Sequence, residues 1–414
     1  MQLVRNGVTH DARVLRAAAT QRRAGWTVSI VGVVTDTQRR PASEHDTIPV
    51  TRLAPRSIGD LRRGARRSDR ALRSPGPPAV AAGGGARSVA ARAAARLSRL
   101  FATADFYRLA FGAVRSRRPA LLHCNDYNTM WVGVAAKVLL GARIVYDSHE
   151  LWADRNGRPE WRPWLVLCEA FFVRIADVVI TASPGYSGEL ARRYRVPLPA
   201  VVRNVPEQVC DPTAPEDPRL LVYVGGLLTG RGLEQAIDGL ELLGDVRLRL
   251  VGAGRAAYVE ALRARAVRRG VQDRVTFAGA VAPQDVPAAA AAGALGLALI
   301  QPVCRSYELT LPNKLFEYAA AGIPVLASDL PVMREVVLAA GLGDVVAPAD
   351  PRAFAAVVRR LLEPDRQLAL RAAVRAFTRV HTAEGERRAL GRAYERALEG
   401  GRTATKSAPS SVRP

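Results

Sequence analysis

The chain has few cysteines, few aromatic residues and almost no lysine. Its four cysteines, at positions 124, 168, 210 and 304 of 414, show neither the paired spacing of a metal site nor the density of a disulfide framework. Aromatic residues make up 6% of the chain and are not interleaved with basic ones, so the stacking platforms that bind nucleic acids are missing. We therefore expect a reduced, cytoplasmic protein with no metal site and no nucleic-acid partner.

Long apolar runs and a leader segment are also missing. The N-terminus MQLVRNG has no charged head followed by an apolar stretch, so we expect no signal peptide. The longest apolar run, 286–300, has 15 residues and is too short to span a membrane. The chain enters its first expected strand within Met1 to Val4, which a start codon assigned too far downstream would explain.

Positive charge, in contrast, is abundant. The formal net charge is +22, and only three of the 60 basic residues are lysines. A GC-rich genome gives this bias toward arginine without functional selection, and we prefer that interpretation to nucleic-acid binding. Residues 56–99 hold 11 arginines against Asp60 and Asp69, with PGPP and GGG among them. This segment is expected to be an insertion, either a solvated loop or a basic patch facing an anionic membrane.

Short β-branched runs alternate with Ala-, Leu- and Arg-rich helical stretches, a pattern typical of parallel α/β sheets. Strands are predicted at 26–34, 119–124, 142–147, 176–182, 219–225, 246–252, 274–279, 295–300 and 323–328. Segment 204–218, with four prolines and four acids, is predicted to be a linker. Because 414 residues exceed one compact core, we predict two doubly wound domains, at 1–204 and 205–380.

Two glycine-rich turns follow strands in the second half. VGAGRAA (251–257) fits a dinucleotide fingerprint, but the next strand ends Phe277-Ala278-Gly279 without the acid that a nicotinamide ribose requires. A tight turn at Gly252 and Gly254 is therefore favoured over an oxidoreductase site. In YVGGLLTGRGLEQAI (223–237), glycines let a phosphate approach the backbone, and Arg231 lies where a helix begins.

A third stretch, LPNKLFEYAAAGIPVLAS (311–328), opens a helix at Pro312, where proline sacrifices no hydrogen bond. The free amides that follow, with Lys314 beside them, form an anion site. Glu317 lies about one turn further on the same face, where a carboxylate can bind vicinal sugar hydroxyls. An anion site beside a sugar-binding carboxylate predicts a nucleotide; the plainer alternative is a buried helix with an exposed Glu-Lys pair.

Taken together, these stretches resemble the GT-B retaining glycosyltransferases of family 4. The resemblance runs from about Val4 to Glu395 and omits the Arg-rich insertion. It is carried by HDARVLRAAATQRRAGWTVSIVG, LLHCND, YDSHELW, ADVVITASPGYSGEL, YVGGLLTGRGLE, RLVGAG, RVTFAGAV and LPNKLFEYAAAGIPVLAS. It implies two Rossmann-like domains facing across a cleft, an acceptor in the first and a nucleotide sugar in the second. It also implies that a last helix, within 381–400, crosses back to the first domain, with a disordered tail at 401–414.

The resemblance assigns donor-binding roles to eight residues. Gly225, Gly226 and Arg231 would contact the diphosphate, and the backbone from Gly279 to Val281 the base. Asn313 and Lys314 would contact phosphates or sugar, and Glu317 the ribose. Such enzymes need no metal or cofactor, and no Asp-x-Asp cation motif is present.

The chain departs from the family pattern at three positions. The second carboxylate of the family, eight residues before Glu317, falls on Leu309, with Glu308 one step away. Gly226 stands where many members have arginine, which leaves Arg231 as the diphosphate cation. Asn125 stands where many members have a sugar-facing histidine.

The remaining candidates lie near predicted strand ends, where open α/β sheets bind ligands. Asp126, His149 and Glu150 are the candidate catalytic residues, and Asn6, Gly7 and His10 form the candidate acceptor loop; His123 is interpreted as a core residue. No residue stands out as an enzyme nucleophile.

The resulting prediction is metal-independent transfer of a hexosyl-type group with retention, to a cell-envelope glycan, glycolipid or small molecule, at the inner face of the membrane or free in the cytoplasm. A sugar-nucleotide epimerase of the same fold is the alternative.

Overall fold

A computed structural model describes residues 1–9, 11–35, 40–56, 86–157, 160–210 and 215–399. His10, residues 57–85 of the Arg-rich segment and the predicted tail at 401–414 lie outside the described residues. Two compact units make up the chain, residues 1–146 and 147–414. The boundary that the sequence suggests, between residues 204 and 205, stays a prediction.

The first unit holds the strands β3-β4-β2-β1-β5-β6, in this order, of a mainly parallel sheet of eight strands. The edge pair β3-β4 is an antiparallel hairpin, whereas β2 pairs in parallel with β4 and β1 with both β2 and β5. Its elements are β1 (Gln2–Leu3), α1 (Ala12–Arg23), β2 (Ile30–Val33), β3 (Ala42–His45), β4 (Ile48–Leu53), α3 (Ala86–Arg117), β5 (Leu121–Asn125), the 3-10 turn η2 (Tyr127–Thr129), α4 (Met130–Leu140) and β6 (Arg143–Ser148), which ends in the second unit.

The second unit contains a six-stranded parallel sheet in the order β11-β10-β9-β12-β13-β14. Its elements are η3 (Trp152–Asp154), α5 (Arg162–Ile175), β7 (Val178–Thr181), α6 (Pro184–Tyr194), β8 (Ala200–Val201), β9 (Leu220–Val224), α7 (Leu233–Leu240), β10 (Arg247–Val251), α8 (Ala256–Arg268), η4 (Gln272–Arg274), β11 (Val275–Gly279), η5 (Pro283–Asp285), α9 (Val286–Ala291), β12 (Leu295–Ala298), α10 (Arg305–Glu308), α11 (Asn313–Ala320), β13 (Val325–Ser328), α12 (Pro331–Ala339), β14 (Gly343–Val346), α13 (Pro351–Leu361), α14 (Pro364–Val380) and α15 (Ala383–Glu399).

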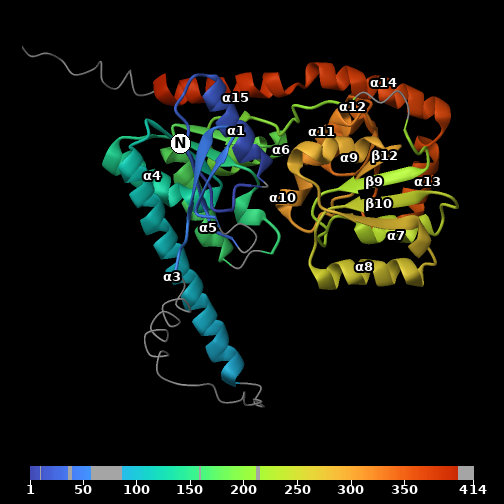
Figure 1. The fold of residues 1–414 in the computed structure, drawn as a ribbon, viewed down its shortest axis with the longest axis horizontal. Helices are drawn as coiled ribbons and strands as arrows, with labels where there is room; N and C mark the ends of the chain where they lie inside the picture. Colours follow the sequence, from blue (N-terminus) through green and yellow to red (C-terminus); the bar gives the residue numbers. More distant parts are fainter. Residues whose placement is uncertain (10, 36–39, 57–85, 158–159, 211–214, 400–414) are drawn as a thin grey trace, which may run out of the picture. The chain divides into compact units, whose positions relative to one another are not determined.

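This strand order is that of a Rossmann fold, with its topological switch between β9 and β12. Strand β9, with the sequence LLVYV, is buried along its whole length because helices cover both faces of the sheet. Leu221 and Tyr223 pack into a core with α7, α8 and α13. Val222 and Val224 pack into a second core with α9, α11, α12 and α14 (Figure 1). The carboxyl ends of β9 and β12 are therefore the place where a ligand is expected.

Each of the nine strands predicted from sequence overlaps a strand of the structure, so the prediction of two parallel α/β sheets is confirmed. The sequence missed β3, β4, β8 and β14. The β3-β4 hairpin turns at Asp46 and Thr47, both at positive φ, without the glycine that usually signals such a turn. Pro49, the second residue of β4, further disguises the strand, because proline cannot donate a hydrogen bond to a neighbouring strand.

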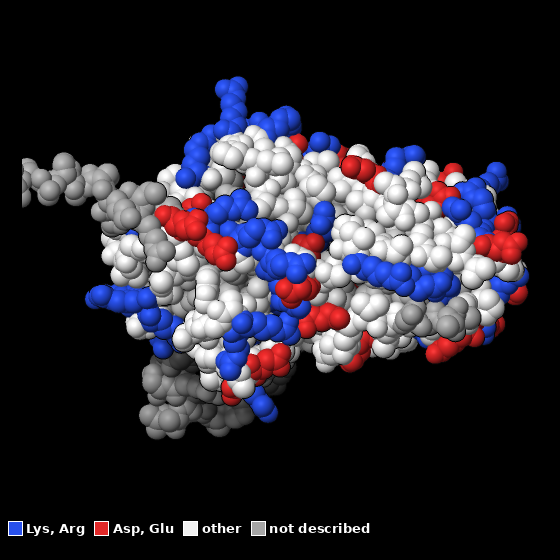
Figure 2. Space-filling view, turned by 90° about the horizontal axis from the view of Figure 1, so that it is seen from above, with Lys and Arg blue, Asp and Glu red and all other residues white. Residues whose placement is uncertain are grey.

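Much of the arginine excess in the second unit is used in ion pairs. Arg265 and Asp238 are joined at 2.5 Å, Arg387 and Glu384 at 2.6 Å. On the face drawn in Figure 2, acidic side chains accordingly lie beside basic ones. The charge of +22 therefore does not by itself indicate one continuous basic surface.

The last helix, α15, packs against β7 and β8 within the second unit. Glu386 fixes its start, because it accepts a hydrogen bond from the Arg203 backbone amide at 2.7 Å and lies 3.1 Å from the Arg203 guanidinium. In the described part of the chain, no helix combines the length and the apolar character needed to cross a bilayer.

Candidate functional site

The turn after β9 brings backbone close to a lysine. Gly225 has φ +137°, and a Cβ at this position would collide with Lys314 Nζ. The Gly225 amide donates to the Val251 carbonyl at 2.8 Å, and Tyr223 OH donates to the Gly226 carbonyl at 2.7 Å. Gly226 itself has an ordinary φ and room for a Cβ, so its place in the turn does not depend on being glycine. The turn is thus fixed at Gly225, beside a cation.

Three strand ends are joined by backbone contacts. A Cβ on Gly252, at φ +154°, would lie on the Gly225 carbonyl oxygen, and the Gly252 amide donates to the Gly279 carbonyl at 2.6 Å. Gly252 and Gly254 lie in the turn between β10 and α8, as the sequence suggested. Gly225 and Gly279, predicted to contact the diphosphate and the base, therefore lie at strand ends on either side of β10. Val281 follows close by with 36% of its surface exposed.

Helix α7 begins at the switch point, with Gly232 as its N-cap. Arg231 precedes this cap, and its guanidinium lies over the ring of Tyr307, 4.8 Å from the ring centre. The Gly230 carbonyl accepts a hydrogen bond from the Gln301 amide at 2.9 Å, which ties the turn to the chain beyond β12. A cation–π contact holds a guanidinium in place without neutralising it. Arg231 thus remains a positive charge at the carboxyl end of the sheet.

Helix α11 supplies the second cation and a carboxylate. Lys314 is half-buried, and its ammonium lies 4.8 Å from the ring centre of Tyr223. The pKa of Lys314 is lowered to about 8, because burial, with a smaller contribution from the charge of Arg231, outweighs the opposing charge of Glu317. Neither cation forms an ion pair with a carboxylate of the described residues. Lys314, Arg231 and Glu317 therefore form one electrostatic cluster with a net positive charge, and exposed Asn313 opens the helix beside them.

The buried Tyr318 positions α11 on the sheet. Its hydroxyl accepts a hydrogen bond from the Val224 amide at 3.2 Å and donates one to the Leu297 carbonyl at 2.9 Å. These bonds join the helix to β9 and β12, the two strands at the switch point. Gly296 leaves room for the ring, because a Cβ there would collide with it. The sequence analysis did not single out Tyr223, Tyr307 or Tyr318, although each is a tyrosine within seven residues of a predicted glycine or cation.

Leu309 stands where the family carries its second carboxylate, and Glu308 is the nearest acid in the sequence. Leu309 is buried, and its carbonyl accepts a hydrogen bond from Ser183 Oγ at 2.7 Å. Glu308 forms an ion pair with Arg305 at 2.8 Å, and Arg305 also lies 3.6 Å from Glu189. Glu308 is thus held by an arginine of its own short helix, α10.

His149 and Glu150 lie in the loop after β6, in the same unit. His149 Nε2 is 3.4 Å from the carboxylate of the buried Asp147, and Glu150 is 3.6 Å from Arg155. This loop reaches α10, because the Leu151 amide donates to Ser306 Oγ at 3.3 Å. Burial raises the pKa of Tyr186 to about 12, and the charge of Glu150 is close enough to contribute. The loop therefore lies against α10, the helix whose Tyr307 ring contacts the Arg231 guanidinium.

The candidates of the first unit gather at its own switch point, between β1 and β5. Asn6 donates to Asp11 at 2.7 Å and accepts from the Val8 amide at 2.8 Å, and the Gly7 carbonyl accepts from Arg52 Nε at 2.8 Å. Asp126 follows β5 with φ +64°, a strained conformation typical of functional turns.

Two neighbours of Asp126 are buried in the sheet. The Asn125 side chain donates to the Gln2 side chain and the Leu3 carbonyl, at 3.0 and 3.1 Å, and so joins β1 to β5. His123 is also fully buried, as expected of a core residue.

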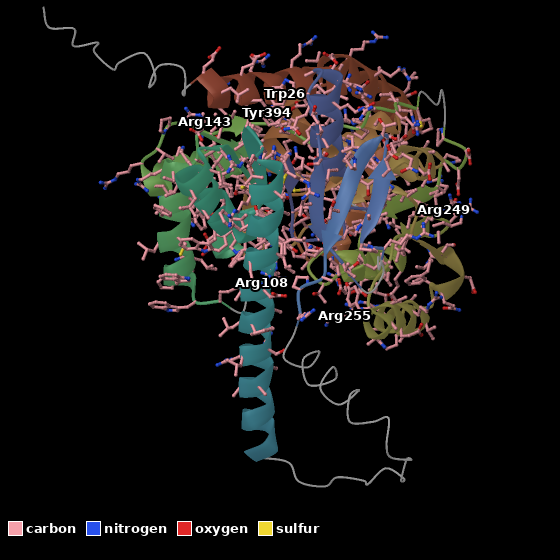
Figure 3. All side chains as sticks on the ribbon, turned by 60° about the vertical axis from the view of Figure 1, so that its left-hand side comes forward. Trp26, Arg108, Arg143, Arg249, Arg255 and Tyr394 are labelled. Carbon is pink, nitrogen blue, oxygen red and sulfur yellow. The ribbon has the colours of Figure 1, made fainter. Side chains whose placement is uncertain are left out.

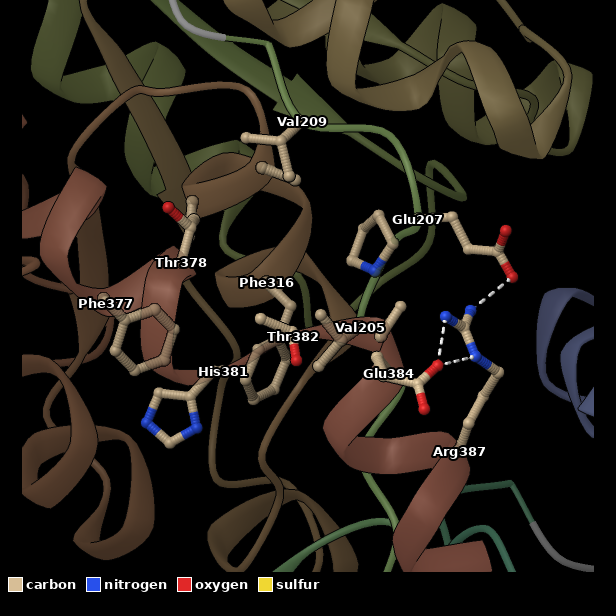
Figure 4. Close-up of a pocket in the computed structure, with 14 residues that line it drawn as sticks. Val205, Glu207, Val209, Phe316, Phe377, Thr378, His381, Thr382, Glu384 and Arg387 are labelled. Atoms are coloured by element: carbon tan, nitrogen blue, oxygen red, sulfur yellow. Dashed lines mark hydrogen bonds and ion pairs between the residues drawn. The ribbon is translucent and has the colours of Figure 1, made fainter. Parts of the chain in front are cut away.

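A separate cavity of about 300 Å³ lies on the opposite face of α11. Phe316 and Phe377 line it, together with His381, and Arg387 bridges Glu207 and Glu384 at its rim (Figure 4). None of the predicted site residues lines it. In the described residues, no three His, Cys, Asp or Glu side chains gather as a metal site would require.

Comparisons with known proteins match both halves of the chain. The family model "Glycosyl transferase 4-like domain" covers residues 10–205, and "Glycosyl transferases group 1" covers residues 218–364. A GDP-mannose-dependent alpha-(1-6)-phosphatidylinositol monomannoside mannosyltransferase of Mycobacterium tuberculosis is 31% identical over 64% of this chain and 74% of its own length. Glycogen synthase of the same organism is 26% identical over 61% of this chain, and the match spans 62% of the synthase.

Solved structures share the fold. Sucrose-phosphate synthase from Thermosynechococcus elongatus superposes with a TM-score of 0.72 at 19% identity, covering 96% of this chain and 99% of the other. The Anabaena HepE protein in complex with UDP-glucose gives a TM-score of 0.67 at 17% identity, covering 95% and 98%. With both sheets, both family models and the mannosyltransferase in agreement, the chain belongs to the group 1 glycosyltransferases of the GT-B fold.

Proposed function

We propose that this protein transfers a sugar from a nucleotide-sugar donor to an acceptor with retention of anomeric configuration. The observation that carries the proposal is the cluster of Arg231, Lys314 and Glu317 at the carboxyl end of the second sheet. Two cations held by tyrosine rings suit a diphosphate, and a carboxylate one turn away suits the hydroxyls of a ribose. The backbone from Gly279 to Val281 is free to receive the base, because a side chain at Gly279 would meet nothing within 4 Å.

Charge develops on the leaving diphosphate during transfer, so fixed positive groups lower the barrier at that point. In this proposal Arg231, Lys314 and the first amides of α11 supply that stabilisation, with no metal ion or cofactor. His149 and Glu150 are proposed to contact the donor sugar or acceptor, because their loop lies against α10. Asp126, Asn6 and Gly7 are proposed for the acceptor side.

The acceptor is proposed to be a glycan or lipid-linked glycan of the cell envelope, reached at the inner face of the membrane. The mannosyltransferase relative, named for a phosphatidylinositol monomannoside, supports a lipid-linked acceptor. Helix α3 adds support in the first unit, because Leu97 and Leu100 on its described part are 60% and 67% exposed beside exposed arginines. This part of α3 extends away from its sheet (Figures 1 and 3).

A panel of nucleotide sugars in a thermal-shift experiment tests the donor. A ligand at about 100 times its dissociation constant stabilises the fold by about 2.7 kcal/mol, enough for a clear rise in the unfolding midpoint. UDP- and GDP-sugars come first, because the HepE structure is a complex with UDP-glucose and the mannosyltransferase is named GDP-mannose-dependent. The stabilising donor is then incubated with and without candidate acceptors. Nucleotide release that requires an acceptor supports transfer, whereas isomerisation of the sugar without one would replace transfer by epimerisation.

A further inference from the structure

Three aromatic side chains form a wall that two cavities of the second unit share. The ring centres of Phe316 and Phe377 are 6.0 Å apart, and those of Phe377 and His381 are 4.2 Å apart. All three line the cavity of about 300 Å³ beside α11, and all three also line a second cavity of about 270 Å³. Phe316 belongs to α11 and Phe377 to α14, and His381 is the residue that ends α14. Elements far apart in the sequence thus present one aromatic wall to both spaces.

The larger cavity has the size and the apolar lining of a small-molecule site. Further apolar side chains come from the segment after β8, from α11 and from the start of α15; they are Val205, Pro206, Val209, Ala319, Ala320 and Ala383. An apolar cavity of about 150 Å³ is enough to hold benzene, and pockets that bind small molecules begin at about 300 Å³. The space therefore admits a molecule of two fused rings.

The charged groups at the rim of the larger cavity balance one another. Arg387 lies 3.0 Å from Glu207 and 2.6 Å from Glu384 (Figure 4). Arg388 lies 3.9 Å from Glu384. Two carboxylates are thus matched by two guanidinium groups, and an ionic ligand would have to compete with these pairs. The rim therefore favours neither an anion nor a cation.

Neutral hydrogen-bonding groups remain inside the cavity. Burial, and after it the charge of Arg203, lowers the pKa of His381 below its ordinary value, so the imidazole is uncharged near neutral pH. An uncharged imidazole offers one donor and one acceptor, and no described residue forms a hydrogen bond with the His381 ring nitrogens. Thr378 Oγ1 donates to the Arg375 carbonyl at 3.0 Å, and its oxygen can still accept a hydrogen bond. The lining thus suits a ligand with an N–H or a ring nitrogen.

We propose that the larger cavity binds a small, flat and uncharged heteroaromatic molecule, which packs on Phe316 and Phe377 and exchanges a hydrogen bond with His381. Aromatic rings attract one another in offset or edge-to-face contact beyond the gain from burial, so a flat ring suits this wall better than a saturated one. Lys314 and Glu317 lie on another face of α11 and do not line the cavity. The site is therefore separate from the proposed nucleotide site and does not depend on the proposed sugar transfer.

The first test titrates the full wild-type chain with indole, which has two fused rings, one N–H and no charge. Cyclohexanol, a saturated ring with one hydroxyl, is the comparison probe. Binding is followed by the methyl NMR signals of Val205 and Val209, which line the cavity, with Val267 on α8 as the reference. We expect indole to shift the signals of Val205 and Val209 but not that of Val267, and to bind about tenfold more tightly than cyclohexanol.

The second test places an indole ring on the chain itself. Val209→Trp adds this ring at the cavity wall, where it competes with free indole, and Val267→Trp is the matched control; the two valines are 56% and 62% exposed. We expect the affinity for indole to fall about tenfold in Val209→Trp and to stay unchanged in Val267→Trp. Indole that leaves the wild-type signals of Val205 and Val209 unshifted, cyclohexanol that binds as tightly as indole, or equal affinity in the two variants would each overturn the proposal.

Discussion

At the scale of the residue, Lys314 shows that a binding site can lower the stability of the unliganded protein. Its ammonium is held beside Arg231 and over Tyr223, and burial lowers its pKa from 10.5 to about 8. The unfolded chain restores the ordinary pKa, so between about pH 8 and 10.5 the unfolded state binds more protons than the folded one. The free energy of unfolding therefore increases as the pH rises through this window. Below about pH 8 Lys314 is charged in both states, so the free energy of unfolding is lowered by the full cost of holding this charge in a half-buried site.

Replacing Lys314 with Met should relieve this burden. We expect Lys314→Met to raise the unfolding midpoint of the unliganded chain at pH 7 and to lose this advantage as the pH approaches 10, since Lys314 is then neutral in the folded wild type. Thermal unfolding followed by circular dichroism at both pH values measures the difference. Lys137→Met, on α4, serves as the control. A Lys314→Met variant less stable than wild type at pH 7 would show that the ammonium stabilises the fold.

The charged residues of the candidate site could be predicted from the sequence, whereas the side chains that hold them could not. Lys314, Glu317 and Arg231 could be named because a helix start, a one-turn spacing and a glycine turn are local features. The tyrosines that hold the two cations could not, because Tyr307 meets Arg231 only through the fold. Asn125 stands where many members of the family have a sugar-facing histidine, and its side chain joins β1 to β5.

At the scale of the element, the site depends on how α11 is fastened to the sheet. Tyr318→Phe removes the hydroxyl that serves both the Val224 amide and the Leu297 carbonyl, and leaves buried backbone groups without that partner. We expect a loss of about 1–3 kcal/mol in the free energy of unfolding. Urea titration gives the value, with Tyr258→Phe as a control because that hydroxyl bonds to a side chain, Glu234, and not to the sheet backbone. An equally small loss of unfolding free energy in both variants would show that the Tyr318 hydroxyl does not hold α11 on the sheet.

Secondary elements were predictable where their pattern is strong. The buried strands β9 and β13 are short apolar runs with glycine or proline close by, and parallel pairing follows from the helices between the strands. The β3-β4 hairpin was missed because its signal, Asp46-Thr47, lacks glycine. Strand order cannot be seen in the sequence, because it depends on which strands come together in the folded sheet; the switch between β9 and β12 appears only in the fold.

At the scale of the whole molecule, the Arg-rich segment 56–99 is predicted to bring the protein to an anionic membrane. Its ends are near one another, because the Arg56 amide donates to Asp105 on α3 at 2.8 Å. Removing residues 57–99 should therefore leave the first unit able to close. We expect the deletion to weaken binding to anionic vesicles, most clearly at low salt, because 10 arginines are lost with two aspartates. Vesicle binding equal to that of the full chain would make the segment a solvated loop.

The central claim is that the protein binds a nucleotide through the Lys314–Glu317 edge of α11. Glu317→Gln keeps side-chain size and helix propensity and removes the charge that accepts hydrogen bonds from ribose hydroxyls. Glu260→Gln on the exposed face of α8 is the matched control. Charge-assisted bonds contribute about 1.5–3 kcal/mol, so calorimetric titration with the stabilising nucleotide should show affinity about ten- to a hundredfold weaker in Glu317→Gln, with an unchanged unfolding midpoint. Unchanged affinity together with a lowered midpoint would instead make Glu317 a packing residue and contradict the account.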